Sequence, residues 1–285
     1  MKIGIIGRGF VGGAVQFGFS ANTGCDAEVK VFDKNPNRSQ NTLDKVVNDS
    51  DFIFLSVPTP ANLDGSVNLD VVDEALSSVN DIITNKDNII LLRSTMTPGS
   101  TAKFQEKYPK LRLVFNPEFL TERSANFDFI NQSRYILGGK PEHTTKVAEM
   151  YRWRFGKSIS VIETDTATAE LIKYMNNCFF ATKVSFMNEM KLVSDTCGAD
   201  WDTAVDGFIR DGRIGHSHLN VPGHDGKLGF GGVCFPKDVL AMIDLGEKLG
   251  IEMNTLKGAW KTNLKVRPEK DWEKLEGQAV VKKTK

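Results

Sequence analysis

Short apolar runs alternate with longer stretches of mixed polarity through the first half of the chain. Such runs are typical of strands buried in a sheet, and the stretches between them have the length of helices. Strands that alternate with helices favour an α/β protein with a parallel, doubly wound sheet. The predicted strands are Lys2–Ile6, Glu28–Phe32, Asp51–Val57, Asn88–Arg93 and Leu111–Phe115.

The pattern changes after residue 165, where one stretch from Thr166 to Cys197 contains neither proline nor glycine and ends before Gly198. Its apolar positions follow a helical stripe, and enough apolar neighbours flank them for burial on more than one side. A helix this long commonly crosses between domains or builds a dimer interface. The stripe consists of Leu171, Met175, Cys178, Thr182, Val184, Met187 and Met190.

With 285 residues, 40% of them hydrophobic, the chain is long enough for two domains. We predict a nucleotide-binding domain over residues 1–163 and a helical central domain over 164–263. Residues 264–285 read as a charged C-terminal tail. The N-terminus enters its first strand directly, which favours a strand over a signal peptide.

Charge and cysteine content narrow the class of protein. The 36 basic and 36 acidic residues balance, so charge gives no argument for a nucleic-acid or membrane partner. No stretch is long and apolar enough to span a membrane. The four cysteines lack metal-ligand spacing, and we interpret them as reduced thiols of a cytoplasmic protein.

A glycine motif follows the first predicted strand. Gly7, Gly9 and Gly12 form a GxGxxG that leads into a helix, the order required by a Rossmann turn, which places phosphates at the helix N-terminus. The second strand ends in Asp33, about twenty residues further on, as that fingerprint expects. A carboxylate there binds a ribose diol and repels a 2′-phosphate, which favours NAD over NADP. The alternative is an acidic residue that merely ends an edge strand.

Three polar loops follow later strands: Val57–Pro60, Ser94–Thr95 and Asn116–Glu118. Ligands of open parallel sheets bind at the carboxyl ends of the strands, so we expect these loops to converge on one crevice. Each loop alone is more often only a turn.

A cysteine lies between a glycine-rich turn and a predicted helix start in the decapeptide from Gly229 to Asp238. Pro236 fits the first helical turn, and the amides and dipole at that end favour a thiolate at Cys234. Asp238, four residues on, returns to the same face as the thiol. Cys234 is therefore a candidate nucleophile, and the alternative is a buried structural cysteine.

Two polar residues lie on one face of the long predicted helix, Lys173 and Asn177. A half-buried lysine can stabilise a developing alkoxide, and an adjacent amide can donate a second hydrogen bond. The alternative is an ordinary lysine that extends its charge to solvent.

These motifs together resemble the UDP-glucose/GDP-mannose dehydrogenase family, whose members oxidise a sugar alcohol to a carboxylate with two NAD. The resemblance rests on GFGGVCFPKD, SVPTP, RSTMTPGST, NPEFLTERSA, and the helix pattern E-x-x-K-Y-x-x-N with a later Asn188–Glu189. It extends from Lys2 to about Asn263, and Arg93 replaces a usual lysine.

The resemblance implies residue roles for a nucleotide-sugar substrate. Cys234 would be the nucleophile, Glu118 would activate water, and Lys173, Asn177, Asp238 and a Thr95-bound water would act on the substrate oxygen. The implied NAD contacts are Gly7, Gly9, Phe10, Val11, Gly12, Asp33, Arg38, Thr59, Thr95 and Glu122. The implied substrate contacts are Glu118, Phe119, Leu120, Lys173, Asn177, Gly231 and Gly232. The long helix would make a homodimer.

The chain departs from the family pattern in two places. Family members usually have a third domain that completes the nucleotide-sugar site, and this sequence has no room for one, so we expect a short form. The loop 219–228 is longer than usual. His224 within it and His216 and His218 just before it have a spacing that fits no common zinc pattern, and we predict no metal. We expect this loop to substitute for some contacts of a third domain.

Two other functions remain open. One is a two-electron NAD-dependent dehydrogenase of a small hydroxy acid or polyol, in which Cys234 would be idle. The other is a catalytically silent NAD-binding subunit. For Glu118 and Glu122, which are four residues apart, a solvated helix face is the alternative to a functional role.

Overall fold

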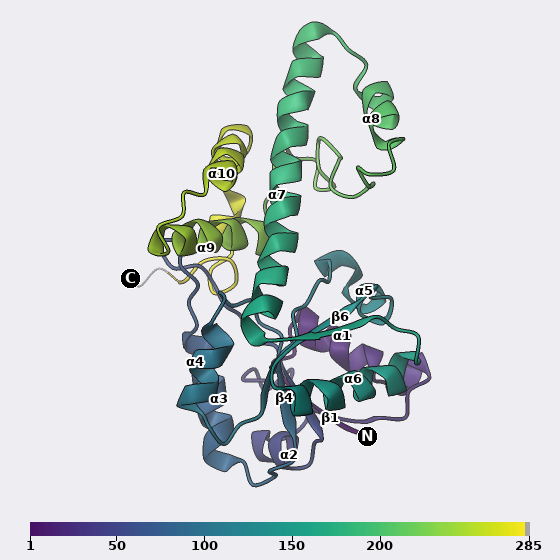
Figure 1. Cartoon of the computed structure of the whole chain (residues 1–285), viewed down its shortest axis with the longest axis vertical. Helices are drawn as coiled ribbons and strands as arrows, with labels where there is room; N and C mark the ends of the chain where they lie inside the picture. The colour runs from purple at the N-terminus through teal and green to yellow at the C-terminus, as the bar shows by residue number, and fades with distance from the viewer. Residues whose placement is uncertain (283–285) are drawn as a thin grey trace. The chain divides into compact units, whose positions relative to one another are not determined.

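The computed structural model describes residues 1–282, and their contacts divide them into two units (Figure 1). The first unit comprises Met1–Thr59 and Leu69–Lys173, and the second comprises Pro60–Asn68 and the residues from Tyr174 onward. By these contacts the division falls after Lys173. Its physical reason is that Ala169 and Glu170 are fully buried, and Glu170 accepts hydrogen bonds from Gly99 and Thr101 of the first unit.

The first unit contains a seven-stranded sheet with the order β2-β1-β3-β4-β5-β6-β7. Strands β1 to β5 are parallel, as predicted, and β6 pairs antiparallel with β5 through Phe115 and Gly138. The last two strands, β6 and β7, were not predicted from the sequence. The strands are β1 (Lys2–Ile6), β2 (Glu28–Phe32), β3 (Phe52–Leu55), β4 (Ile89–Leu92), β5 (Leu113–Phe115), β6 (Tyr135–Gly138) and β7 (Val161–Thr164).

Helices cover both faces of this sheet (Figure 1). One face packs against α1 (Phe10–Gly18), α5 (Ala125–Ile130) and α6 (Pro141–Phe155). The other packs against α2 (Leu43–Asn48), α3 (Asp70–Ile82) and α4 (Ser100–Lys107). Two separate apolar cores on opposite faces are the mark of a doubly wound sheet, so the predicted fold class is confirmed.

The second unit is helical and is built around the part of α7 (Thr166–Cys197) that follows Lys173. The whole helix has the predicted bounds. Tyr174, Cys178 and Ala181 of α7 pack against α9 (Cys234–Lys248) and α10 (Asn254–Val266). The shorter helix α8 (Trp201–Ile209) follows α7.

One side of α7 is exposed within the single chain. Burial on more than one side was expected, and Met175, Phe179 and Phe186 are 61%, 64% and 46% exposed. The helix has more apolar positions than α9 and α10 can cover, and the excess remains on one exposed face.

The segment after α10 packs within the second unit, although its composition predicted a charged tail. Trp272, in the 3₁₀ helix Asp271–Lys274, is only 3% exposed and packs against Trp260 with ring centroids 5.4 Å apart. Ala61 donates a backbone hydrogen bond to Ala279 (2.9 Å) and accepts one from Val281 (2.8 Å). Residues 283–285 of the predicted tail lie outside the described residues.

Candidate active site

The glycine turn between β1 and α1 has the conformation that a dinucleotide site needs. Gly7 has φ +89°, and a Cβ there would lie 2.4 Å from the Ser56 carbonyl oxygen. A Cβ on Gly12 would lie 2.0 Å from the Gly7 carbonyl oxygen. Gly9 caps the N-terminus of α1, whose first residues are Phe10 and Val11, and a Cβ there would meet nothing within 4 Å. The backbone is therefore open to a phosphate at the helix N-terminus.

Asp33 directly follows β2, and local hydrogen bonds fix its carboxylate. Its Oδ2 accepts from the Arg8 amide at 2.6 Å and its Oδ1 from the Asn35 amide at 2.8 Å. An open hollow of about 580 Å³ is lined by residues between Phe32 and Lys45, and Asp33 is one of them. Arg38 lies in the turn beyond Asp33 but does not line this hollow. A glycine turn beside an oriented carboxylate fits the pyrophosphate and ribose of NAD.

The polar loops after β3, β4 and β5 lie side by side at the carboxyl edge of the sheet. The Ser94 hydroxyl donates to the Val57 carbonyl oxygen at 2.7 Å. The Arg93 guanidinium donates to Asn116 Oδ1 at 2.7 Å. Thr59 is buried, and Thr95 is partly exposed between these loops. The loops thus converge as the strand order requires.

Lys173 reaches the loop after β5 and is only 4% exposed. Its Nζ donates to the backbone carbonyl oxygen of Glu118 and lies 5.3 Å from the centroid of the Phe119 ring. The alternative interpretation of Lys173, a lysine that extends its charge to solvent, is therefore excluded. A buried ammonium with one identified acceptor keeps donor capacity for a substrate oxygen.

Glu118 is 6% exposed and lies in a loop, so the solvated helix face is excluded for it. One of its carboxylate oxygens accepts from the backbone amide of Leu120. Glu122, by contrast, is exposed at the start of the 3₁₀ helix Glu122–Ser124. The two carboxylates therefore do not share a helix face.

The second unit contains a buried polar cluster in the first turns of α9. Asp238 has no exposed surface, and its Oδ2 accepts from Asn177 Nδ2 at 2.6 Å. Its Oδ1 is paired with Lys237 Nζ at 2.5 Å. Sequence reasoning missed Lys237, although the residue lies inside the decapeptide that identified Cys234. Both carboxylate oxygens of Asp238 are therefore engaged, and the hydrogen bond to one of them orients the Asn177 amide.

Two cysteines of this unit differ in their environment. Cys178 is 7% exposed, and burial, followed by the nearby Asp238 charge, raises the pKa of its thiol well above the usual range. Cys234 is the first residue of α9 and is partly exposed. An accessible thiol at a helix N-terminus can react, whereas a desolvated thiol is inert.

The glycines before Cys234 differ in their freedom. Gly232 has φ +72° and is open, whereas a Cβ on Gly231 would lie 2.6 Å from Arg267 Nη2. In the preceding segment, His218 stacks on Phe180 with ring centroids 4.1 Å apart. Within residues 1–282, no three His, Cys, Asp or Glu side chains are placed to hold a metal ion.

Comparison with known proteins agrees with this geometry. Residues 29–154 match the NAD-binding domain of the UDP-glucose/GDP-mannose dehydrogenase family, and residues 167–265 match its central domain. The chain belongs to this family. The predicted membership is thus confirmed, and the NAD-binding domain also confirms NAD as the cofactor.

Individual relatives are similar over most of the chain. An uncharacterized protein of Methanocaldococcus jannaschii is 35% identical over an alignment of 303 positions, which covers 93% of this chain and 33% of that protein. The UDP-glucose 6-dehydrogenase of Rickettsia typhi is 37% identical over 223 residues, 76% of this chain and 50% of that enzyme. The structure of a UDP-glucose dehydrogenase from Pyrobaculum islandicum has a TM-score of 0.79 at 28% identity, covering 92% of this chain and 67% of that one.

The chain therefore spans half or less of the length of these two curated relatives. Within residues 1–282, no helix combines the length and the apolar character needed to cross a lipid bilayer.

Proposed function

We propose that the protein is an NAD-dependent nucleotide-sugar dehydrogenase that oxidises a primary alcohol, as in UDP-glucose, to the uronic acid. The observation that carries this proposal is the partly exposed Cys234 at the start of α9, followed in the next turn by the buried Asp238–Asn177 contact. A two-electron alcohol oxidation needs no cysteine. A four-electron oxidation needs a group that retains the aldehyde.

In the first step, Lys173 and Asn177 hold the alcohol oxygen by hydrogen bonds, and a water on Thr95 with Asp238 receives its proton. NAD bound to the first unit accepts one hydride in each oxidation. The Cys234 thiolate adds to the resulting aldehyde and forms a thiohemiacetal, whose oxidation leaves a thioester. Water activated by Glu118 then releases the acid and regenerates the thiol. One water is consumed, and two NAD are reduced per sugar.

Several observations support these roles. Lys173 is buried beside Glu118 and Phe119, which suits a charge that must be strong toward a developing alkoxide. Phe119, Leu120, Gly231 and Gly232 are proposed to contact the sugar. Similar curated proteins are named UDP-glucose 6-dehydrogenase, which supports UDP-glucose as the first substrate to try. We place the enzyme in the cytoplasm, because the reaction requires a reduced Cys234.

We also propose a homodimer that covers the exposed face of α7. Met175, Phe179, Phe186 and Val193 are 46% to 64% exposed, and their spacing places them on one face of the helix. A contiguous apolar face of this kind marks an interaction surface. Light scattering tests the proposal, and a mass of 31.6 kDa, that of the single chain, would contradict it.

The reaction is tested by counting NADH formed per sugar consumed, with UDP-glucose, UDP-N-acetyl sugars and GDP-mannose supplied separately. Cys234→Ser should retain NAD binding and form no acid. Cys197→Ser is the matched control, since Cys197 is exposed at the far end of α7. We expect two NADH per sugar from the parent and the control. Normal turnover by Cys234→Ser would refute the scheme, and silence with every sugar despite NAD binding would favour another substrate or a non-catalytic role.

A further inference from the structure

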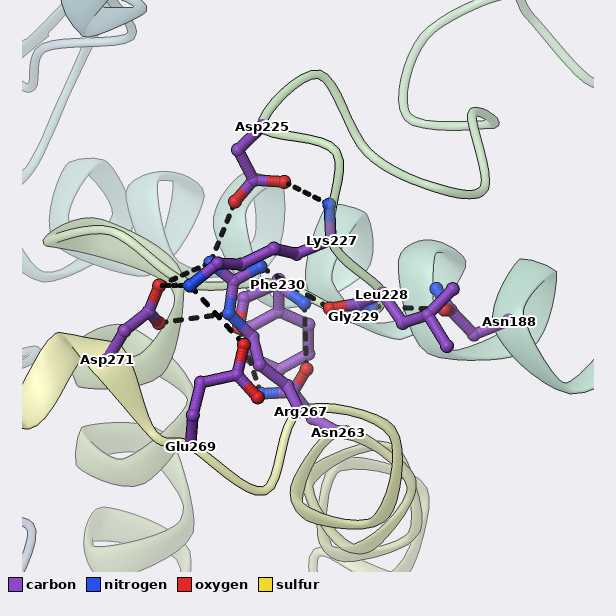
Figure 2. A network of polar contacts seen from close by, with 10 residues as sticks. All are labelled: Asn188, Asp225, Lys227, Leu228, Gly229, Phe230, Asn263, Arg267, Glu269 and Asp271. Atoms are coloured by element: carbon purple, nitrogen blue, oxygen red, sulfur yellow. Dashed lines mark hydrogen bonds and ion pairs between the residues drawn. The ribbon is translucent and has the colours of Figure 1, made fainter.

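Three side chains hold the backbone of the turn that leads to Cys234 (Figure 2). The Gly229 amide donates to Asn188 Oδ1 at 3.0 Å. Asn263 binds both backbone groups of Phe230, accepting from its amide at 2.7 Å and donating to its carbonyl oxygen at 3.0 Å. Arg267 Nη1 donates to the Leu228 carbonyl oxygen at 3.3 Å. The turn is therefore fixed residue by residue.

Arg267 is the charged member of this group and is only 3% exposed. Its Nε and Nη2 donate to the two carboxylate oxygens of Asp271 at 2.9 and 2.7 Å, and Nη2 also donates to Asp225 at 2.7 Å. The Arg267 hydrogen bond, with a smaller contribution from Lys227, holds the pKa of Asp271 well below its usual range. A guanidinium held by two carboxylates has a fixed plane.

That plane lies against the glycine turn. A Cβ on Gly231 would come within 2.6 Å of Arg267 Nη2 and 2.7 Å of its Cζ. A Cβ on Gly229 would lie 2.3 Å from Asn263 Oδ1. Since Gly231 precedes Cys234 by three residues, a shift of the guanidinium would move the turn that sets the position of the thiol.

The longer loop before the turn is joined to the same network. The Gly223 amide donates to the Lys227 carbonyl oxygen at 2.7 Å, which closes the loop on itself. Lys227 Nζ then lies 2.9 Å from Asp271 and 3.3 Å from Glu269 (Figure 2). The charges of Asp225 and Lys227 are thus engaged by the segment after α10, which begins with Arg267.

We propose that Arg267 is a positioning residue for Cys234: with Asp225 and Asp271 it clamps the Gly229–Gly231 turn and sets the presentation of the thiol. The proposal deepens the proposed function, because positioning matters for catalysis only if Cys234 is the nucleophile. Arg267 is buried between two partly exposed carboxylates, and in this proposal the network selects one conformation of the turn.

Alkylation of Cys234 by iodoacetamide reports on this clamp without any substrate. In a Cys197→Ser background, Cys234 is the one thiol that is not buried, because Cys25 and Cys178 are buried. The variants are Arg267→Gln, Arg267→Lys, which keeps the charge but loses the fork, and Asp225→Asn. The control is Asp206→Asn, which removes an exposed ion pair with Arg210 in the same unit. Mass spectrometry of the peptides gives the rate at each cysteine.

We expect Arg267→Gln to accelerate labelling of Cys234 by about 5- to 30-fold, with smaller increases for Arg267→Lys and Asp225→Asn and none for the control. Cys25 and Cys178 should stay protected, since local release does not open the core. Parent rates in Arg267→Lys and Asp225→Asn would overturn the proposal, as would simultaneous labelling of all three cysteines. The NADH count with Cys234→Ser decides the proposed function separately.

Discussion

Removing the charge of Asp238 should strongly destabilise the second unit. Asp238 is fully buried, with Lys237 Nζ at 2.5 Å and Asn177 Nδ2 at 2.6 Å. Asp238→Leu leaves the Lys237 ammonium, itself 5% exposed, without a counter-ion. Breaking one partner of a buried pair costs about 3–5 kcal/mol. At 2–4 °C per kcal/mol, a loss of about 4 kcal/mol lowers Tm by roughly 8–16 °C.

The double variant Lys237→Met/Asp238→Leu separates stability from chemistry. It removes both charges, and a buried ion pair replaced by apolar side chains is often close to neutral. The Asn177 amide still loses its acceptor, which costs about 1–3 kcal/mol. We therefore expect the double variant to be more stable than Asp238→Leu alone, yet inactive, because Asn177 is no longer oriented.

Urea unfolding followed by circular dichroism measures these differences. The control is Glu247→Gln, which breaks the pair of Glu247, on the same helix, with Lys257; the two side chains are 61% and 44% exposed. Solvent-exposed pairs contribute at most about 1 kcal/mol, so the control should unfold almost as the parent does. The reasoning is wrong if Asp238→Leu costs less than about 1 kcal/mol, or if the double variant is as unstable as the single one.

Two further predictions concern other parts of the chain. Asp33→Asn should weaken NAD binding about tenfold and reduce the preference for NAD over NADP, because the carboxylate binds the ribose diol. Calorimetry measures the affinity for each cofactor, and affinities equal to those of the parent would contradict this prediction. The Arg267 hydrogen bond is the main cause of the lowered folded-state pKa of Asp271. The ionised carboxylate therefore stabilises the folded state fully above the unfolded pKa of about 3.9, and this stabilisation is lost as the pH falls through the lower folded value. Urea unfolding should therefore show Asp271→Asn to be less stable than the parent by about 1–2 kcal/mol at pH 7, and the gap should shrink below pH 4; a gap that widens in acid would show the sign to be wrong.

The sequence by itself determined the features that depend on local geometry. Continuous apolar runs identified β3, β4 and β5, because a strand buried on both faces needs them. The strand β2 alternates apolar and charged residues and was placed by its distance from the glycine motif. The bounds of α7 followed from the absence of glycine and proline between Thr166 and Cys197. Gly7 and Gly12 were identifiable because the positive φ of Gly7 and the exclusion of a Cβ at Gly12 by the Gly7 carbonyl oxygen both arise within one turn.

The sequence did not predict the strands β6 and β7 or the packing of the segment from Asp271 to Val281. The strand β7 carries an exposed glutamate and shows no clear apolar run. The strand β6 is apolar and fully buried, and the prediction from the sequence did not include it. The segment from Asp271 to Val281 read as a charged tail, since its two anchoring contacts, Trp272 with Trp260 and Ala279 with Ala61, join residues distant in sequence.

Only the tertiary structure decided how the charged groups are paired. No spacing indicates that Lys237 is buried against its neighbour Asp238, or that Lys173 meets a carbonyl oxygen 55 residues away. The contact of Arg267 with Asp225 spans 42 residues. Burial and charge pairing depend on which surfaces meet after the chain has folded, and periodicity along the sequence carries no record of that meeting.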